Sequence, residues 1–535
     1  MCLRIFGSVP VWLRARSGGL IAIVLTVVGL GLLAPGLSNA AGRRGARDGG
    51  AAPQDGARPK RGATPPPNAT LLTVDPRVTG NRISAGFLGL SFEYWAAANY
   101  AGKNPNAVDP VLVQLIRNLM PDGGGSLRIG GVTTDWTWYP VRGVARPGGV
   151  NYTLTTSRLE VLGELARAVG ARLILGLNLE ANNPAVPTAE ERAMLKVIGR
   201  KNIQAFELGN EPELYSSFPW YYASDGSGVV GRPSGWDFSM FNQDYQRIAG
   251  ALGPVPLAGP TVGALSWVDL SQFLASEPRI SLVALHRYPT WGCFNSPSSD
   301  TYPTLGNLLS EFASGGLAES LAPFVAIAHA HHLTLRNDEM NSVSCGTANG
   351  VANVFGSALW SLDALFQMAR VGVDGVNIHT APTYPDRLFV AKKVHHVWRA
   401  AVEPEYYGLL MFAQAAPPGS RLVQISGASG DLRAWATRGA DGAFRVLLIN
   451  DDTTHAHTLA VRVPGARGPA AVERLEAPSV HATTGITLGG QTFGAETTTG
   501  ALPTVAPVAL AQRAGDYDVR MPAASAALLT VAASS

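Results

Sequence analysis

The chain has 535 residues, which is enough for two or more hydrophobic cores. Its net charge is only +3, so no global electrostatic field would attract it to nucleic acid, and the basic excess gathers at residues 43–61. The 60 glycines and 37 prolines predict many turns and loops between short elements.

The first 40 residues have the pattern of a secretory signal peptide. Arg14 and Arg16 precede an apolar run over 20–34, and small residues at 38–40 offer a cleavage site. The alternative is an uncleaved membrane anchor, because the apolar stretch almost reaches the length that spans a bilayer. We therefore expect a secreted or cell-surface protein, attached to a membrane only if this segment is retained. Residues 41–69 contain no large apolar side chain and are expected to form a disordered linker.

From residue 85 onward, apolar runs alternate with amphipathic stretches. The sequence predicts strands at 87–94, 126–130, 172–179, 203–209, 255–259, 282–288, 333–339 and 375–380. It predicts helices at 109–119, 158–169, 189–200, 240–252, 268–276, 316–331, 351–371 and 405–416. Eight strand–helix units over about 330 residues indicate the α/β class and a (β/α)8 TIM barrel at 85–418.

The C-terminal region has a different pattern. After residue 418 the helix signals disappear, and short alternating runs such as 432–437 and 444–449 appear. This pattern predicts an antiparallel β-sandwich domain at 419–535. The N-terminal segment 70–84 contains one short apolar run that could add a strand to this domain.

Two apolar runs end in a glutamate at the mouth of the predicted barrel. Phe-Glu-Leu-Gly-Asn-Glu-Pro at 206–212 ends in Glu211-Pro212, and the run at 333–339 ends in Glu339. Hydrolysis of a glycosidic bond needs two such carboxylates, one to protonate the leaving oxygen and one to attack or to activate water. We predict Glu211 as the acid/base and Glu339 as the nucleophile of a retaining enzyme. Strand alternation predicts that Asp338 points away from the barrel interior, and Glu213 is expected in a loop.

Other polar residues at strand ends are expected to support the two glutamates. Arg128 could hold Glu339 ionised or form a buried ion pair with Glu207, and the sequence leaves both roles open. Tyr288 could donate a hydrogen bond to the nucleophile. His286 shares the face of Tyr288 and is either a core histidine or a member of the site.

The cysteines and histidines give no sign of a metal site or another cofactor. If Cys2 leaves with the signal peptide, Cys293 and Cys345 remain, and in an exported chain they suggest one disulfide. The alternative is two unrelated small buried residues. The pairs at 331–332 and 395–396 are read as surface histidines, the first at the barrel end opposite the chemistry and the second in a helix or loop.

Four segments together resemble glycoside hydrolase family 79, which contains β-glucuronidases and the heparanases. They are Ser91–Tyr94, Leu127–Gly131, Glu207–Pro212 and Asp338–Ser342. The likeness runs from about residue 71 to the C-terminus and includes the trailing β-domain. The Asn-Glu-Pro motif is shared with many retaining barrel glycosidases, and the order of the motifs narrows the likeness to this family. The resemblance implies the same roles for Glu211 and Glu339.

The resemblance also implies contacts with the sugar. Asn210 would contact the 2-hydroxyl, and Glu93 would contact a hydroxyl of the terminal sugar. In the family's glucuronidases, a Tyr and a Gly shortly after the nucleophile and a later Tyr hold the glucuronate carboxylate. Here Gly346 and Tyr384 stand at matching offsets, whereas Ser344 replaces the first Tyr. A serine hydroxyl and backbone N–H groups can still bind a carboxylate.

These patterns predict a secreted retaining β-glycosidase that removes terminal β-linked glucuronic acid through a covalent glycosyl-enzyme intermediate. Alternatives within the class are a neutral sugar and endo-acting, heparanase-like cleavage. The barrel loops carry Arg142, Arg146 and Arg232 but no dense basic cluster, which favours exo action. A non-catalytic carbohydrate-binding protein is the alternative from another class. The expected partner is a carbohydrate substrate, with no nucleic acid and no metal. A disulfide between Cys293 and Cys345 would join two loops over the mouth of the active site.

Overall fold

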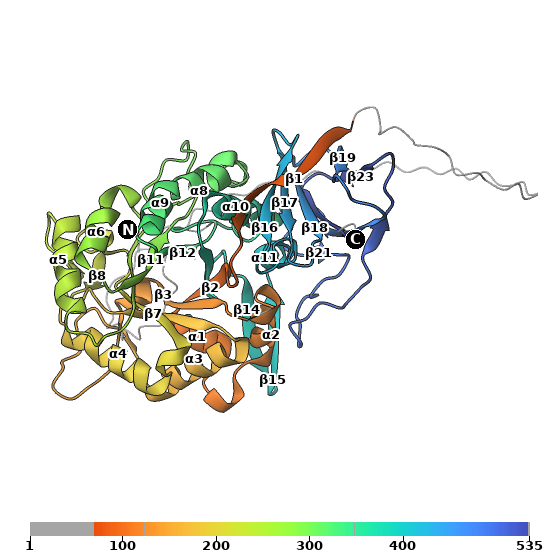
Figure 1. Cartoon of the computed structure of the whole chain (residues 1–535). Helices are drawn as coiled ribbons and strands as arrows, with labels where there is room; N and C mark the ends of the chain where they lie inside the picture. Colours follow the sequence, from red (N-terminus) through yellow and green to blue (C-terminus); the bar gives the residue numbers. More distant parts are fainter. Residues whose placement is uncertain (1–68, 122, 347, 533–535) are drawn as a thin grey trace, which may run out of the picture. The chain divides into compact units, whose positions relative to one another are not determined.

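The computed structural model describes residues 69–121, 123–346 and 348–532, all within one compact unit, Thr64–Ser535 (Figure 1). The predicted signal peptide and the linker up to residue 68 lie outside the described residues. Within the described part, no helix combines the length and the apolar character that crossing a bilayer requires.

Eight parallel strands close into a barrel, which confirms the predicted fold class. Around the barrel the strands follow the order β10-β11-β12-β13-β2-β3-β6-β7. In chain order they are β2 (Leu88–Glu93), β3 (Ser126–Gly130), β6 (Arg172–Leu177), β7 (Ile203–Leu208), β10 (Leu257–Val262), β11 (Ile280–His286), β12 (Thr334–Met340) and β13 (Gly375–Thr380). Each coincides with a predicted strand, because buried parallel strands read as short apolar runs between turn signals.

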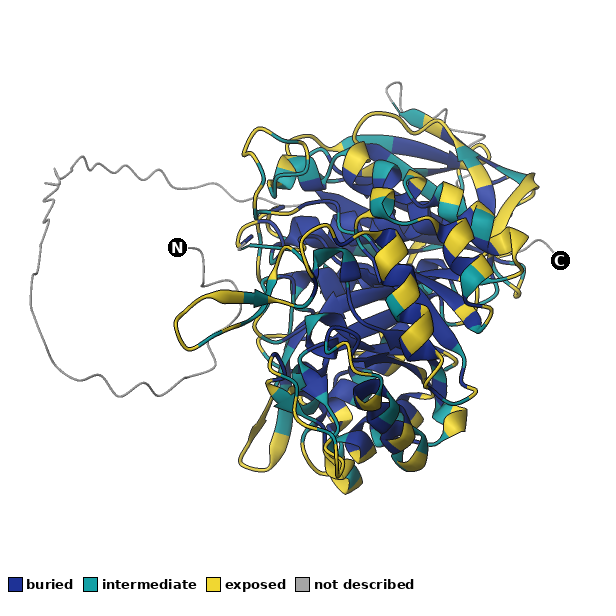
Figure 2. Ribbon diagram, turned by 90° about the vertical axis from the view of Figure 1, so that its left-hand side faces the viewer, coloured by how far each residue is buried: buried dark blue, intermediate teal, exposed yellow. Residues whose placement is uncertain are grey.

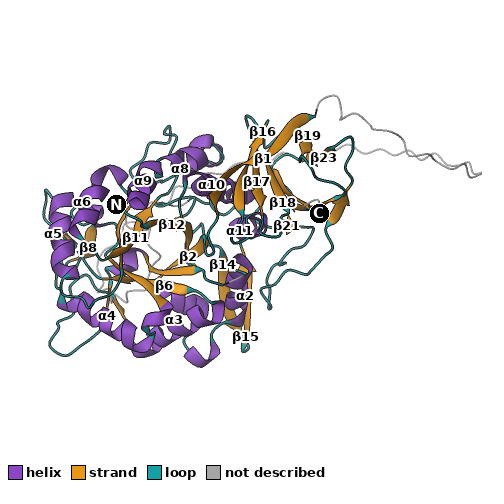
Figure 3. Cartoon of the chain, in the orientation of Figure 1, coloured by secondary structure: helices purple, strands orange, loops and turns teal. Residues whose placement is uncertain are grey.

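Helices surround the barrel strands (Figure 3). They are α1 (Tyr94–Ala101), α2 (Pro110–Leu119), α3 (Thr156–Val169), α4 (Ala185–Val197), α5 (Phe238–Ala249), α6 (Leu270–Ser276), α7 (Leu305–Leu308), α8 (Leu317–Glu319), α9 (Ala322–Ala330), α10 (Phe355–Val371) and α11 (Pro404–Ala415). Capping fixes several starts; for example, the Asp109 side chain accepts a hydrogen bond from the N–H of Val111.

One helix that the sequence predicts as continuous is two helices in the structure. The range 316–331 was expected as a single helix, but the structure divides it into α8 and α9. Pro323 stands at the second position of α9, where a missing N–H costs nothing, whereas in a helix interior it would remove a hydrogen bond. The proline therefore favours a new helix start inside the predicted range.

The interior of the barrel is filled in layers. A small apolar cluster of Ile174, Ala205, Ala258, Leu282 and Ala284 packs inside it. In Figure 2 the barrel strands are almost wholly buried, and the outer faces of the helices carry the exposed residues. Polar side chains gather beyond the apolar cluster, at the C-terminal strand ends, where barrel enzymes carry their chemistry.

The C-terminal region forms one continuous ten-stranded sheet with the strand order β21-β20-β24-β18-β17-β16-β1-β19-β23, and β22 pairs with β20. The strands are β1 (Thr70–Arg82), β16 (Arg421–Ser426), β17 (Leu432–Arg438), β18 (Phe444–Asn450), β19 (His457–Arg462), β20 (Ala470–Glu476), β21 (Thr487–Leu488), β22 (Val508–Leu510), β23 (Asp516–Met521) and β24 (Ser525–Val531). β1 is antiparallel to β16 and parallel to β19. A second hydrophobic cluster, which includes Leu72, Val446 and Tyr517, is enclosed by these strands.

The sheet packs on the barrel through helix α10. Trp435 of β17 stacks on Phe366, with ring centroids 5.5 Å apart, and its indole N–H donates to Asp363 over 2.7 Å. Leu447 and Ile449 of β18 belong to the same hydrophobic cluster as the barrel helices. The two domains therefore share one continuous core.

Three small two-stranded sheets extend the loops that follow barrel strands. They are β4 (Thr137–Trp138) with β5 (Tyr152–Thr153), β8 (Pro219–Tyr222) with β9 (Gly228–Val230), and β14 (Phe389–Val394) with β15 (Val397–Val402). His395 and His396 form the exposed turn of the β14–β15 hairpin, both with positive φ. This fixes the second histidine pair in a turn.

Candidate active site

Glu211 lies on a tight turn after β7. Gly209 and Glu211 both have positive φ, at 79° and 47°. A Cβ on Gly209 would stand 2.3 Å from the Tyr215 hydroxyl, so only glycine fits there. The Glu211 N–H donates to the carbonyl of Thr261 over 2.9 Å, which anchors the turn to β10. The turn places the carboxylate 3.2 Å from Nδ1 of His286.

Glu339 lies near the end of β12, where the strand pairing shifts. Leu285 pairs with Asn337, whereas the next residue, His286, pairs with Glu339. This bulge inserts Asp338 as an extra residue and breaks the two-residue alternation of side chains. The prediction that Asp338 points out of the barrel is therefore wrong. Its Oδ1 lies 3.6 Å from Nε2 of His286, inside the same buried cluster as Glu339.

Arg128 joins the pieces of this cluster. Its fully buried guanidinium donates to Oε2 of Glu207 over 2.8 Å and also forms an ion pair with Glu339. A third hydrogen bond of 2.9 Å reaches Oδ1 of Asn210. The two roles that the sequence left open are thus filled together, because one planar guanidinium carries several donors in fixed directions.

The surroundings of Glu339 favour its charged form. Tyr288 donates from its hydroxyl to Oε1 of Glu339 over 3.0 Å. Burial alone would raise the pKa of Glu339, but the charges of His379, His286 and Arg128 outweigh it and hold this pKa well below the usual range. Glu339 is therefore ionised at neutral pH.

Asp338 shows the opposite behaviour although it is the preceding residue. Burial, reinforced by the charge of Glu207, raises the pKa of Asp338 well above its usual range. This shift favours the protonated form of Asp338. This leaves the single positive charge of Arg128 to be shared by Glu207 and Glu339.

Glu93 forms the opposite wall of the cluster, at the end of β2. Its Oε2 accepts from the N–H of Thr133 over 3.0 Å, and the Tyr384 hydroxyl donates to its Oε1 over 3.1 Å. Nε2 of His379 lies 3.4 Å from the same Oε1. The structure thus brings the side chains of Glu93 and Tyr384 into contact.

His379 was missed by the sequence reasoning. Its Nδ1 is hydrogen bonded to Ser91 Oγ at 2.9 Å and lies 4.0 Å from Oε2 of Glu339. Burial would lower the pKa of His379, but the charges of Glu339 and Glu93 raise it overall. A usable signal existed, because Asn377 and His379 are polar residues at alternating positions of a barrel strand.

Asp135 was also missed, and it holds the loop that presents Asn210. Its Oδ2 accepts from the N–H of Asn210 over 3.0 Å and from the Tyr215 hydroxyl over 2.7 Å. Its Oδ1 accepts from the N–H groups of Leu179 and Glu180. Asp135 therefore links the segments that follow β3, β6 and β7.

Glu213, expected in a loop, lies in the 3-10 turn Pro212–Leu214 and ties it to the neighbouring loop. Its Oε1 accepts from the N–H groups of Gly263 and Ala264 over 2.6 and 2.7 Å. Burial and the charge of Glu211 raise the pKa of Glu213 to about 8. A neutral Glu213 therefore sits beside Glu211 at pH 7.

The segment after β12 carries the disulfide. Cys293 and Cys345 are bonded, with Cα atoms 5.5 Å apart, so the loops after β11 and β12 are joined as predicted. Ser344 is exposed, and its N–H donates to the carbonyl of Thr290 over 3.1 Å. In the described part of the chain, no hydrogen bond links Ser344 or Gly346 to the two glutamates.

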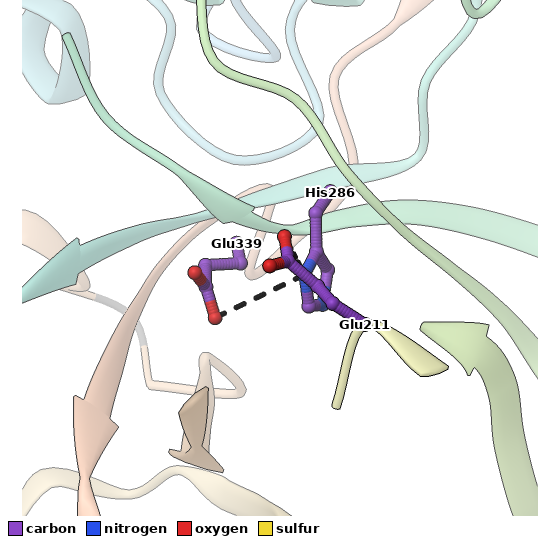
Figure 4. A group of neighbouring side chains, drawn as sticks. All are labelled: Glu211, His286 and Glu339. Atoms are coloured by element: carbon purple, nitrogen blue, oxygen red, sulfur yellow. Dashed lines mark hydrogen bonds and ion pairs between the residues drawn. The ribbon is translucent and has the colours of Figure 1, made fainter. Parts of the chain in front are cut away.

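Glu211, His286 and Glu339 each offer one ligand atom, and these atoms lie within 4.8 Å of one another (Figure 4). The three side chains have the ligand types that could hold a metal ion. However, the guanidinium of Arg128 already pairs with Glu339, and its positive charge opposes a cation at the same oxygen atoms. The same convergence suits two carboxylates that act on one bond.

Comparison with known proteins agrees with this geometry. Residues 434–528 match the model of the glycosyl hydrolase family 79 C-terminal beta domain. A beta-glucuronidase of Neurospora crassa is 24% identical over 404 residues, which cover 66% of this chain and 67% of that protein. A beta-glucuronidase of Aspergillus niger is 24% identical over 513 residues, which cover 83% of this chain and 90% of the relative.

Solved structures show the same fold. A 4-O-alpha-L-rhamnosyl-beta-D-glucuronidase from Fusarium oxysporum 12S superposes with a TM-score of 0.69 at 20% identity, covering 86% of this chain and all of the other. A family 51 arabinofuranosidase from Xanthomonas axonopodis pv. citri reaches a TM-score of 0.59 at 16% identity, covering 87% of this chain and all of the other. Taken together, the matched beta domain and the two relatives show that the chain is a glycoside hydrolase that is similar to family 79.

Proposed function

We propose that the chain is a retaining β-glycosidase that removes terminal β-linked glucuronic acid. The observation that carries the mechanism is that oxygen atoms of Glu211 and Glu339 lie within 4.8 Å of each other. Retaining glycosidases place their carboxyl groups about 5–5.5 Å apart, whereas inverting ones need about 6.5–9.5 Å to admit a water. The short separation supports direct attack by one carboxylate on the sugar.

In the first step, ionised Glu339 attacks the anomeric carbon while Glu211 gives its proton to the departing glycosidic oxygen. The carbon–oxygen bond to the aglycone breaks, and a covalent glycosyl-enzyme ester forms. In the second step, Glu211 takes a proton from a water molecule, and the oxygen of that water attacks the anomeric carbon. The ester bond breaks, Glu339 leaves as a carboxylate, and the sugar leaves with its original anomeric configuration.

The choice of glucuronic acid has two supports. The two curated relatives are beta-glucuronidases. In this chain, His379 adjoins Glu93 at the wall of the cluster, and its raised pKa favours the imidazolium cation. The rings of His379 and Tyr384 are neighbours, with centroids 5.9 Å apart, and a cation at this wall suits a sugar that carries a carboxylate.

A neutral β-linked sugar is the second candidate, and one observation favours it. Ser344 stands where the family's glucuronidases have a Tyr, and it is exposed without a hydrogen bond to either glutamate among the described residues. That position offers less to a sugar carboxylate than a tyrosine would.

A panel of p-nitrophenyl β-glycosides tests both candidates. We expect kcat/KM for the glucuronide to exceed the values for the glucoside, galactoside and xyloside by at least about 100-fold, because a site built around a charged group rejects analogues that lack it. Cleavage of a neutral glycoside but not of the glucuronide would overturn the proposed sugar specificity without contradicting the proposed mechanism. Proton NMR of the first product should show the β-anomer; the α-anomer would overturn the mechanism.

We also propose that the protein is exported. The signal-peptide pattern at 1–40 supports this, and so does the Cys293–Cys345 disulfide, since disulfides persist mainly in oxidising compartments. Mass spectrometry of protein recovered from the culture medium should show a chain that starts after residue 40 and has no free thiol. Two free thiols, or an intact N-terminus in the cell membrane, would contradict secretion.

A further inference from the structure

A hollow of about 440 Å³ lies between the end of α1 and the β14–β15 hairpin, outside the glutamate cluster. We call it the hairpin pocket. Its exposed polar lining consists of Lys103, Lys392, Lys393, Asn99 and Asn104. The rest of the lining is small apolar residues and the half-buried ring of Trp398. An apolar surface with a few cations and amides at its edge is typical of a small-molecule site.

The backbone builds this pocket around Trp398. Gly102 ends α1 with a positive φ of 88°, and a Cβ there would stand 3.0 Å from the indole ring. Lys393 faces Trp398 across the hairpin, with Nζ 5.4 Å from the ring centroid. The glycine thus lets the ring lie against the helix end, and the hairpin holds a cation beside the ring.

The cations of the pocket are only partly neutralised. Lys392 pairs with Glu496, which also lies 4.0 Å from Arg399. Lys103 and Lys393 have no ion pair with any residue that the structure describes. Lys393 also interacts electrostatically with the buried carboxyl of Asp109. Because neither ammonium group is held in an ion pair, the edge of the hollow keeps a local positive potential that attracts an anion.

We propose that the hairpin pocket binds a uronic acid unit of an acidic glycan, as a second carbohydrate site. The Trp398 ring offers a flat apolar face to the C–H side of a sugar ring, and Lys103 and Lys393 offer charge-assisted hydrogen bonds to its carboxylate. The volume falls within the range of about 300–1,000 Å³ that small-molecule sites occupy. The residues of the pocket favour a ligand that combines a ring with a negative charge. The choice of a uronic acid among such ligands rests on the proposed function.

Both walls of the pocket are connected along the chain to residues of the glutamate cluster. Helix α1 starts directly after Glu93, and its eight residues span about 12 Å. β14 follows the loop that carries Tyr384. A glycan held in the hairpin pocket would therefore be kept close to the catalytic end of the barrel. We expect the pocket to lower KM for an acidic polymer and to leave a small glucuronide unaffected.

The test measures binding of a hyaluronan decasaccharide, which contains glucuronic acid, to the Glu339→Gln protein by calorimetry. The pocket variant adds Lys103→Glu and Lys393→Glu, and the control adds Lys196→Glu and Lys201→Glu, the same charge change at exposed lysines of α4 and the turn before β7. We expect the pocket variant to lose at least about tenfold in affinity and the control less than twofold. Trp398→Phe, which keeps the charges, should retain most of the affinity, whereas Trp398→Ala should lose it.

Equal losses in the pocket and control variants would overturn the proposal, because they would show general charge attraction. No loss in either would overturn it as well. In the otherwise native enzyme, the two pocket substitutions should leave kcat/KM for p-nitrophenyl β-glucuronide within twofold. If the native enzyme cleaved no glucuronide, the proposed function would be overturned. The calorimetric result would still test the pocket independently.

Discussion

The ends of β7 and β12 carry the same residue type in two different settings. The Glu339 side chain is 11% exposed and is bound by Arg128 and the Tyr288 hydroxyl. The Glu211 side chain is 26% exposed, lies on a left-handed turn and meets His286. This difference supports the two roles that we propose: a buried cation keeps one glutamate charged, and the greater exposure of the other lets it reach a leaving group.

The largest expected effect comes from removing the charge on the β12 side. Glu339→Gln should lower kcat by at least about 10⁴-fold, because the amide cannot form the glycosyl ester. Steady-state kinetics with p-nitrophenyl β-glucuronide measures this. Asp338→Asn is the matched control in the same strand and should stay within about tenfold, since the raised pKa of Asp338 favours the neutral form that asparagine mimics. If Asp338→Asn were the inactive variant, the two neighbours would have exchanged roles.

A second test concerns the leaving group on the β7 side. Glu211→Gln should slow cleavage of a methyl or alkyl glucuronide by about 10²–10⁴-fold, the usual contribution of a general acid. The p-nitrophenyl substrate needs less protonation, so the first step should suffer far less with it. Burst kinetics separates the two steps. Equal losses of rate in the first step with both leaving groups would contradict the proposed role of Glu211 as the general acid.

A third test removes the cation that separates the two settings. Arg128→Met should lower the free energy of unfolding by about 3–5 kcal/mol, because the buried carboxylates of Glu207 and Glu339 would both lose the cation that pairs with them. Urea denaturation followed by tryptophan fluorescence gives this value. Arg192→Met, at an exposed arginine of α4, should change it by less than about 0.5 kcal/mol. A similar small change for Arg128→Met would show that solvent reaches the cluster.

The smallest effect is a pH dependence at Asp386, a buried residue between β13 and β14. Burial raises the pKa of Asp386 to about 7, although the charge of His379 opposes the shift. A raised folded-state pKa contributes stability that is fully present below about pH 4 and is lost as the pH rises through about 7. Asp386→Asn cannot ionise, so its stability relative to the native protein should rise from pH 4.5 to pH 7.5. Thermal unfolding at both values measures this; a constant difference would mean that Asp386 titrates normally.

The sequence predicted the parts of this site that depend on regular periodicity. Apolar runs located all eight barrel strands, and a carboxylate after each of two runs located Glu211 and Glu339. The orientation of Asp338 could not be predicted, because the bulge depends on the pairing of β12 with β11. The pairing of Arg128 with both Glu207 and Glu339 and the position of His379 likewise depend on how distant strands meet in the closed barrel.

The pairing of β1 has a consequence for biosynthesis. β1 leaves the ribosome before the barrel, but its hydrogen-bonding partners, β16 and β19, are made after the barrel is complete. A nascent chain therefore carries an unpaired strand throughout barrel synthesis, and unpaired strands are sites of aggregation. A chain truncated at residue 418 would keep this strand without its sheet. Removing residues 70–82 as well would then give a cleaner boundary for producing the barrel alone.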